Sequence, residues 1–105
     1  MYRESAPQPF WPNLDLYTNA SGELIIDVEL SQIISQDLDL VVDGCRLLIR
    51  GKRLEIETAD SYLIREIPRG PFERIVNLPS DFDVGAAKAA YLQGELRIIV
   101  PPKGR

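Results

Sequence analysis

Residues 24–30 read Leu24-Ile25-Ile26-Asp27-Val28-Glu29-Leu30, a run in which apolar and acidic side chains alternate. One face carries only apolar residues, namely Leu24, Ile26, Val28 and Leu30. Asp27 and Glu29 lie between them. Because successive side chains of a β-strand point to opposite faces, the run predicts a strand with one face on a core.

The same period of two recurs in four further segments. It is seen at Leu38, Leu40 and Val42, at Leu47 and Ile49, at Phe72, Val76 and Leu78, and at Leu96, Ile98 and Val100. Asp43-Gly44 predicts a hairpin turn, because both residues tolerate the positive φ of tight turns. Short alternating strands with turns between them predict an all-β antiparallel sandwich or barrel.

Two segments do not follow this pattern. Residues 81–92 contain four alanines and allow a short helix by propensity, but we favour a turn followed by a strand over residues 88–92. Between Lys52 and Phe72 lies a long stretch with few core positions, although residues 62–67 favour β-structure. Connections of this length are uncommon in compact domains, so the stretch suggests pairing with another chain.

The composition argues against several classes of function. Histidine is absent and Cys45 is the only cysteine, so the usual general base, an intrachain disulfide and a thiolate metal cluster are all missing. We expect Cys45 to cap a turn rather than act as a nucleophile. Sixteen carboxylates allow an acid–base pair, but their spacing singles none out, so we predict no enzyme, cofactor or metal.

The charge and the apolar runs bear on partners and location. A net charge of −4 argues against nucleic acid, and we interpret the basic residues from Arg46 to Arg53 as a solvated strand face. The sequence has no apolar run of membrane-spanning length and no secretory pattern at its start, which predicts a cytoplasmic protein. Residues 1–12 are proline-rich around Phe10 and Trp11 and predict an extended arm.

Several motifs, in order, resemble the α-crystallin domain of small heat-shock proteins of the bacterial and plant type. Residues 72–79 (FERIVNLP) are similar to the family's segment F-x-R-x-[aromatic or aliphatic]-x-L-P. Residues 89–101 (AAYLQGELRIIVP) resemble its A-x-x-x-n-G-v-L-x-I-x-V-P signature, and residues 47–53 (LLIRGKR) its L-x-I-x-G-x-[KR] strand. The match covers about residues 13–102, which we take as the domain, with residues 103–105 as a short remnant.

The resemblance implies an immunoglobulin-like sandwich of seven to eight strands that forms a homodimer. In the family, the long loop carries a strand that is exchanged with the partner. The corresponding dimer-interface residues are Tyr62, Leu63, Ile64, Arg65, Glu66, Ile67 and Arg74. Arg74 shares an apolar face with Phe72 and Val76, so we predict a carboxylate or carbonyl partner, with an arginine reaching solvent from the strand end as the alternative.

The resemblance also implies a groove that accepts client segments or a C-terminal tail. Its walls are Leu38, Leu40 and Val42 on one strand and Ala89 and Tyr91 on another, although alternation looks the same for plain core residues. The implied function is an ATP-independent holdase for unfolded clients. A co-chaperone that docks on an ATP-driven chaperone is the alternative, and an enzyme on a sandwich is a distant third.

Two departures from the family pattern stand out. Leu30-Ser31-Gln32 replaces the usual Leu-Pro-Gly, which we expect to alter a turn and not a site. The chain also ends at Arg105 without the family's I-x-I or I-x-V tail motif, and only about a dozen residues precede the first strand. Whether extensions were removed is left open. A dimer rather than a large shell is expected.

Overall fold

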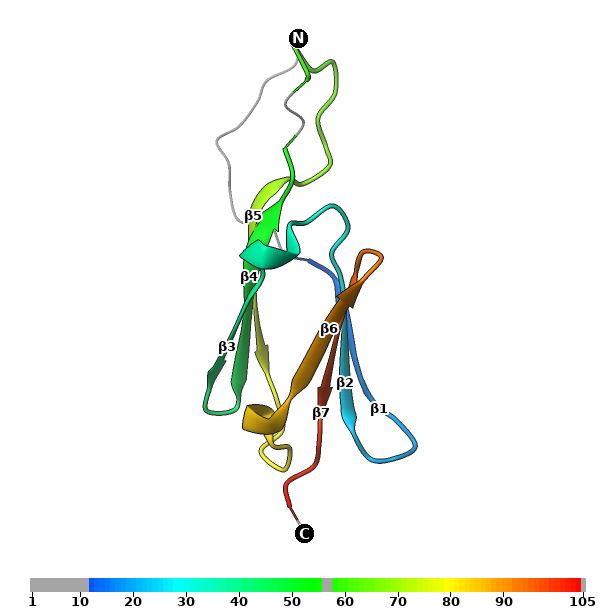
Figure 1. Cartoon of the computed structure of the whole chain (residues 1–105), viewed down its shortest axis with the longest axis vertical. Helices are drawn as coiled ribbons and strands as arrows, with labels where there is room; N and C mark the ends of the chain where they lie inside the picture. Colours follow the sequence, from blue (N-terminus) through cyan, green and yellow to red (C-terminus); the bar gives the residue numbers. More distant parts are fainter. Residues whose placement is uncertain (1–11, 56–57, 105) are drawn as a thin grey trace.

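The computed structural model describes residues 12–55 and 58–104, which form a β-sandwich (Figure 1). The described residues contain seven strands: β1 (Leu14–Thr18), β2 (Leu24–Glu29), β3 (Asp39–Asp43), β4 (Arg46–Arg53), β5 (Gly70–Asn77), β6 (Lys88–Leu92) and β7 (Glu95–Val100). Single turns of 3₁₀-helix, η1 (Ser35–Asp37) and η2 (Val84–Ala86), precede β3 and β6. The predicted all-β sandwich is confirmed.

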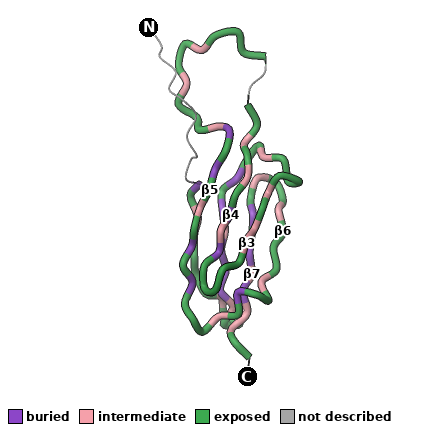
Figure 2. Tube along the Cα trace, turned by 90° about the vertical axis from the view of Figure 1, so that its left-hand side faces the viewer, coloured by how far each residue is buried: buried purple, intermediate pink, exposed green. Residues whose placement is uncertain are grey.

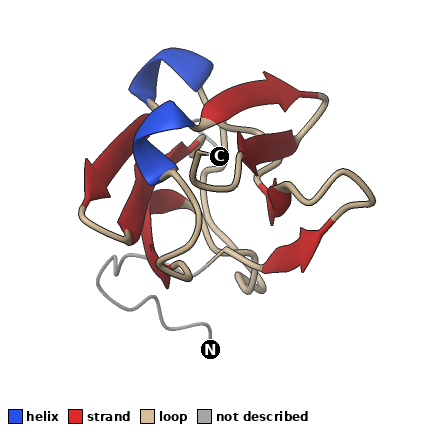
Figure 3. Cartoon of the chain, turned by 90° about the horizontal axis from the view of Figure 1, so that it is seen from below, coloured by secondary structure: helices blue, strands red, loops and turns tan. Residues whose placement is uncertain are grey.

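The strands form two antiparallel sheets, one in the order β1-β2-β7-β6 and the other in the order β3-β4-β5. Figure 3 shows the two layers from the lower end of the molecule. Their inner faces supply a continuous, mainly aliphatic core: Leu24, Ile26, Val28, Leu30, Leu47, Ile49, Phe72, Val76, Leu78, Val84, Leu96, Ile98 and Val100. Burial of this apolar surface is the main force that holds the sheets together.

The register between β2 and β7 explains why the alternation of residues 24–30 determines the inner face. Ile26 lies opposite Ile98, and Val28 lies opposite Leu96, so both pairs point into the core. Asp27 lies opposite Arg97 on the outer face. A shift by one residue would turn every one of these side chains to the wrong face, which makes this register strongly specified.

Both local turn predictions are confirmed. The hairpin between β3 and β4 contains Gly44 at a φ of 61°, a conformation that glycine adopts without steric cost. In residues 81–92, the turn contains the short η2, and β6 then pairs with β7 along its whole length. Cross-strand pairing and packing therefore override the helix propensity of the alanines.

The connection from β4 to β5 projects from one end of the sandwich (Figure 2). Its described residues contain no strand, and most of them are exposed. The first eleven residues, including Phe10 and Trp11, lie outside the described residues, so the predicted arm stays a prediction. Within the described ranges, no helix is long and apolar enough to cross a membrane.

Candidate dimer interface and client-binding groove

The long loop presents apolar side chains to solvent at the positions that the sequence singled out for dimer contact. Leu63 is 90% exposed, Ile64 73% and Ile67 58%. Neighbouring exposed aliphatic residues on an irregular segment are unfavourable in water unless another surface covers them. This segment therefore exposes apolar surface and pairs with no strand that the structure describes, and its role in dimer contact stays a prediction.

Two other loop residues are held in place within the same chain. A guanidinium nitrogen of Arg65 donates to Glu55 Oε1 at 2.9 Å. The same guanidinium lies over the Tyr62 ring, with its central carbon 4.9 Å from the ring centroid. These contacts link the outgoing and returning limbs of the loop and limit its conformational freedom.

Arg74 has the kind of partner that its position in the sequence predicts. It lies on β5 opposite Ile49, between the buried Phe72 and Val76, and its Nη1 donates to the Pro12 carbonyl oxygen at 2.8 Å. The carbonyl comes from the same chain, just before β1. Arg74 thus ties the edge strand of one sheet to the start of the other sheet. Its role in dimer contact stays a prediction.

The five groove residues lie on or beside two edge strands, β3 and β6, which belong to different sheets. In Figure 2, β6 lies at the right of the sandwich and β5 at the left, with β3 between them. Leu38, Leu40 and Tyr91 are partly buried against the core, and the Tyr91 hydroxyl donates to the Leu30 carbonyl oxygen. Val42 and Ala89 are exposed. The set therefore combines edge-of-core residues with accessible apolar ones, and the groove between them stays a prediction.

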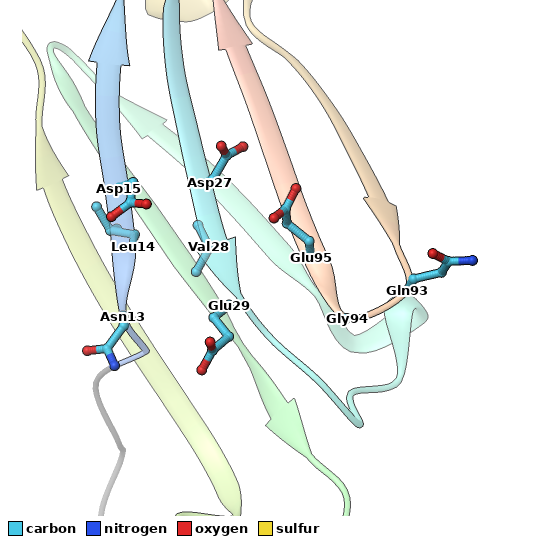
Figure 4. A pocket seen from close by; sticks show the side chains of 9 residues that line it. All are labelled: Asn13, Leu14, Asp15, Asp27, Val28, Glu29, Gln93, Gly94 and Glu95. Carbon is cyan, nitrogen blue, oxygen red and sulfur yellow. The ribbon is translucent and has the colours of Figure 1, made fainter.

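A hollow on the outer face lies between β1, β2 and the turn from β6 to β7 (Figure 4). It is lined by Asn13, Leu14, Asp15, Asp27, Val28, Glu29, Gln93, Gly94 and Glu95. Several of these residues are carboxylates, which makes the hollow the natural place to look for an acid–base pair. Asp27 is not suited to act as a general acid, because the pKa of its carboxyl is lowered, chiefly by the hydrogen bond from Arg97. A general acid needs the opposite shift.

Asp27 is the centre of a polar network that sequence reasoning missed. Its carboxylate accepts from Arg97 Nε at 2.7 Å and from the Tyr17 hydroxyl at 2.7 Å. The hydrogen bond to Asp27 raises the pKa of Tyr17. The outward parity of Asp27 and Arg97 was visible in the sequence, but the pairing of β2 with β7 was not.

Cys45 is exposed and forms the β3–β4 turn together with Gly44. Its carbonyl oxygen accepts a hydrogen bond from the Leu78 amide at 2.8 Å. This position agrees with a turn residue. Among the described residues, no group of three or more His, Cys, Asp or Glu side chains has the arrangement of a metal site.

Comparisons with known proteins support the resemblance seen in the sequence. The sequence model of the Hsp20/alpha crystallin family matches residues 17–105. Small heat shock protein C2 of Rickettsia felis is 32% identical over 104 residues, which are 97% of this chain and 67% of that protein. Small heat shock protein C4 of the same organism is 34% identical over 94 residues, 88% of this chain but only 57% of the relative.

The fold is also similar to solved structures. hspA from Xanthomonas axonopodis superposes with a TM-score of 0.80 at 23% identity, over 91% of this chain and 97% of that one. A small heat-shock protein from Xylella fastidiosa gives a TM-score of 0.80 at 22% identity, over 93% and 91% of the two chains. At these identities the structures show the fold alone. The family model matches most of the chain, and a curated relative is more than 30% identical over nearly all of it. The chain therefore belongs to the Hsp20/alpha crystallin family of small heat-shock proteins.

Proposed function

We propose that this chain is an ATP-independent holdase that binds partially unfolded proteins and suppresses their aggregation. The observation that carries the proposal is the family match over residues 17–105 together with the sandwich fold. The family is one of chaperones rather than enzymes. The alternative function, docking on an ATP-driven chaperone, receives no support from the family match or from the relatives described above.

The proposed mechanism needs weak apolar contacts and no chemical step. A client that has lost its fold exposes apolar surface, and a protein that covers this surface keeps it from other unfolded chains by mass action. Such contacts can come from the accessible side chains of Val42 on β3 and Ala89 on β6, together with the half-buried Tyr91. We propose this pair of edges as the site for client segments or for a C-terminal tail.

We further propose that two copies form a homodimer by exchanging residues 62–67. An extended segment added to a sheet edge satisfies its own backbone groups and those of the edge. Among the strands that the structure describes, β1, β3, β5 and β6 lie at sheet edges. Since β3 and β6 flank the proposed groove and β5 is the strand into which the loop leads, we take β1 as the acceptor. Leu16 and Tyr17 on that strand are each 42% exposed, so apolar surface is available there.

The domain limits and the location belong to the same proposal. We take residues 13–102 as the α-crystallin domain, since the strands and their core lie inside this range. A cytoplasmic location suits a chain whose one cysteine forms no internal disulfide. The chain spans 67% and 57% of the lengths of the two Rickettsia relatives. The holdase activity, which is that of the whole relatives, is therefore a proposal for this chain.

Two measurements test the proposal. The chain is mixed with a heat-labile client without nucleotide, and light scattering is followed during heating. We expect scattering to fall as the chain approaches molar excess, and undiminished scattering at a large excess would contradict the holdase function. Deletion of residues 62–67 is expected to convert a dimer into monomers by light scattering of the purified protein. A deletion variant with unchanged mass would contradict strand exchange.

A further inference from the structure

The base of the long loop is tied to the segment after β2 by contacts from both of its limbs. On the outgoing limb, the Leu54 amide donates to the Gln32 carbonyl oxygen at 2.8 Å, and Ile33 forms a bridge with Arg53. On the returning limb, Arg69 Nη1 donates to Gln32 Oε1 at 3.0 Å and to the Leu54 carbonyl oxygen at 3.2 Å. Gln32 therefore contacts both limbs, one through its backbone and the other through its side chain.

Arg53 adds a second connection at the same place. Its Nε donates to the Ser31 carbonyl oxygen at 3.1 Å, and its Nη1 donates to the Pro68 carbonyl oxygen at 2.9 Å. The two arginines thus bring Pro68 and Arg69 back to the end of β4, where the loop leaves the sandwich (Figure 1). The orientation of the loop root relative to the sandwich is set by these contacts.

Gln32 holds this position in a backbone conformation that few side chains favour. Its φ is 58°, in the left-handed region where glycine is under the least steric strain. A glycine would relieve the strain and would keep the backbone bond to Leu54, but it has no side-chain oxygen for Arg69. We expected the Gln32 replacement to alter only a turn. Because its side chain also contacts Arg69, Gln32 connects this turn to the returning limb of the long loop.

We propose that Gln32 and Arg69 are positioning residues that orient the long loop between β4 and β5 before a second copy of the chain binds. The inference rests on the strand exchange proposed above, because only then does loop orientation control association. A loop that is already ordered loses less conformational entropy on binding, so its affinity for the partner is higher. The two residues thereby set the strength of the dimer without touching the core.

The test compares Gln32→Gly with Gln93→Gly in the full chain. Both residues have a positive φ, 58° and 52°, but Gln93 lies in the β6–β7 turn and not at the loop base. Sedimentation velocity over a dilution series gives the dimer dissociation constant. Loss of the charge-assisted contact and of the ordered loop root is expected to raise it about three- to tenfold for Gln32→Gly. Gln93→Gly is expected to leave it unchanged.

Hydrogen exchange separates positioning from a general loss of structure. In Gln32→Gly, the Leu54 amide, which donates to the Gln32 carbonyl oxygen at the loop base, is expected to exchange faster, while amides of β2 and β7 keep their protection. Arg69→Met is expected to weaken the dimer to a similar degree in the wild-type chain. In the Gln32→Gly background its effect is expected to be smaller, because the contact between the two is already gone.

The outcomes distinguish this inference from the proposed function. If deletion of residues 62–67 gives monomers but Gln32→Gly and Arg69→Met leave the dissociation constant unchanged, the positioning role is overturned and strand exchange stands. If the deletion variant remains a dimer of unchanged affinity, strand exchange fails and the positioning role fails with it. Equal weakening by Gln32→Gly and Gln93→Gly also overturns the positioning role.

Discussion

Gly51 lies opposite Phe72 in the β4–β5 ladder, and the Phe72 ring occupies the space that a side chain at Gly51 would need. A Cβ built at Gly51 would lie 2.6 Å from Phe72 Cζ and 2.9 Å from Cε2. Phe72 is buried in the core at 2% exposure, so its ring has no room to move aside. The glycine in this strand is therefore a packing requirement of the aromatic residue beside it.

Gly51→Ala is expected to destabilise the fold. Overpacking of a close-packed core typically costs about 1–3 kcal/mol of unfolding free energy. Urea denaturation at fixed protein concentration measures the loss. Gly104→Ala is the matched control, since nothing lies within 4 Å of a Cβ at that position. Equal stability of the two variants would contradict the packing role of Gly51.

Asp27→Asn is expected to lower stability near neutral pH by about 1 kcal/mol, the usual range for a partly exposed ion pair with good geometry. Because the folded-state pKa of Asp27 is lowered, its stabilising contribution is present above the pKa of the unfolded chain and is lost as pH falls through the folded value. The difference between wild type and Asp27→Asn should therefore disappear in acid. Urea unfolding between neutral pH and about pH 2 follows it. A difference that stays constant over this range would contradict the prediction.

Arg74→Met is expected to release the start of β1 by removing the bond from Arg74 to the Pro12 carbonyl oxygen. The Glu29 amide donates to the Asn13 carbonyl oxygen next to this contact, so its hydrogen exchange reports the change. A stability loss of about 1–2 kcal/mol is expected for a part-buried charged hydrogen bond. Arg50→Met, which removes only an exposed ion pair with Asp39, serves as control and should change little. Unchanged Glu29 exchange in Arg74→Met would show that Arg74 does not hold this segment.

Val42→Asp is expected to weaken suppression of client aggregation several-fold while the fold remains intact, because the substitution places a charge in the proposed groove at a side chain that is 46% exposed. Leu92→Asp provides the comparison. Leu92 is also an exposed apolar residue on an edge strand, but it lies opposite Glu95 on the outer face of its sheet. Equal loss of suppression in both variants would mean that general surface polarity, and not the groove, controls client binding.

The alternation of residues 24–30 and of the later segments was enough to predict the strands and their inner faces. The reason is geometric: a period of two matches the pleat of a strand, so the pattern itself states which face is buried. The alanine-rich segment was harder, because its local propensity favours a helix. Pairing of β6 with β7 decided it, and that interaction involves a neighbouring strand as well as the segment itself.

For the candidate site too, some features followed from the sequence and others only from the tertiary structure. The sequence alone determined an all-β antiparallel fold, the long β-prone loop and the need of Arg74 for a polar partner. Only the tertiary structure decided that Asp27 binds Arg97, 70 residues away, and that Gln32 binds Arg69, 37 residues away. Side-chain alternation tells which face a residue occupies but not which strand or loop lies beside it. That choice depends on register and on the close packing of the whole core, where even the ring of Phe72 determines what residue 51 can be.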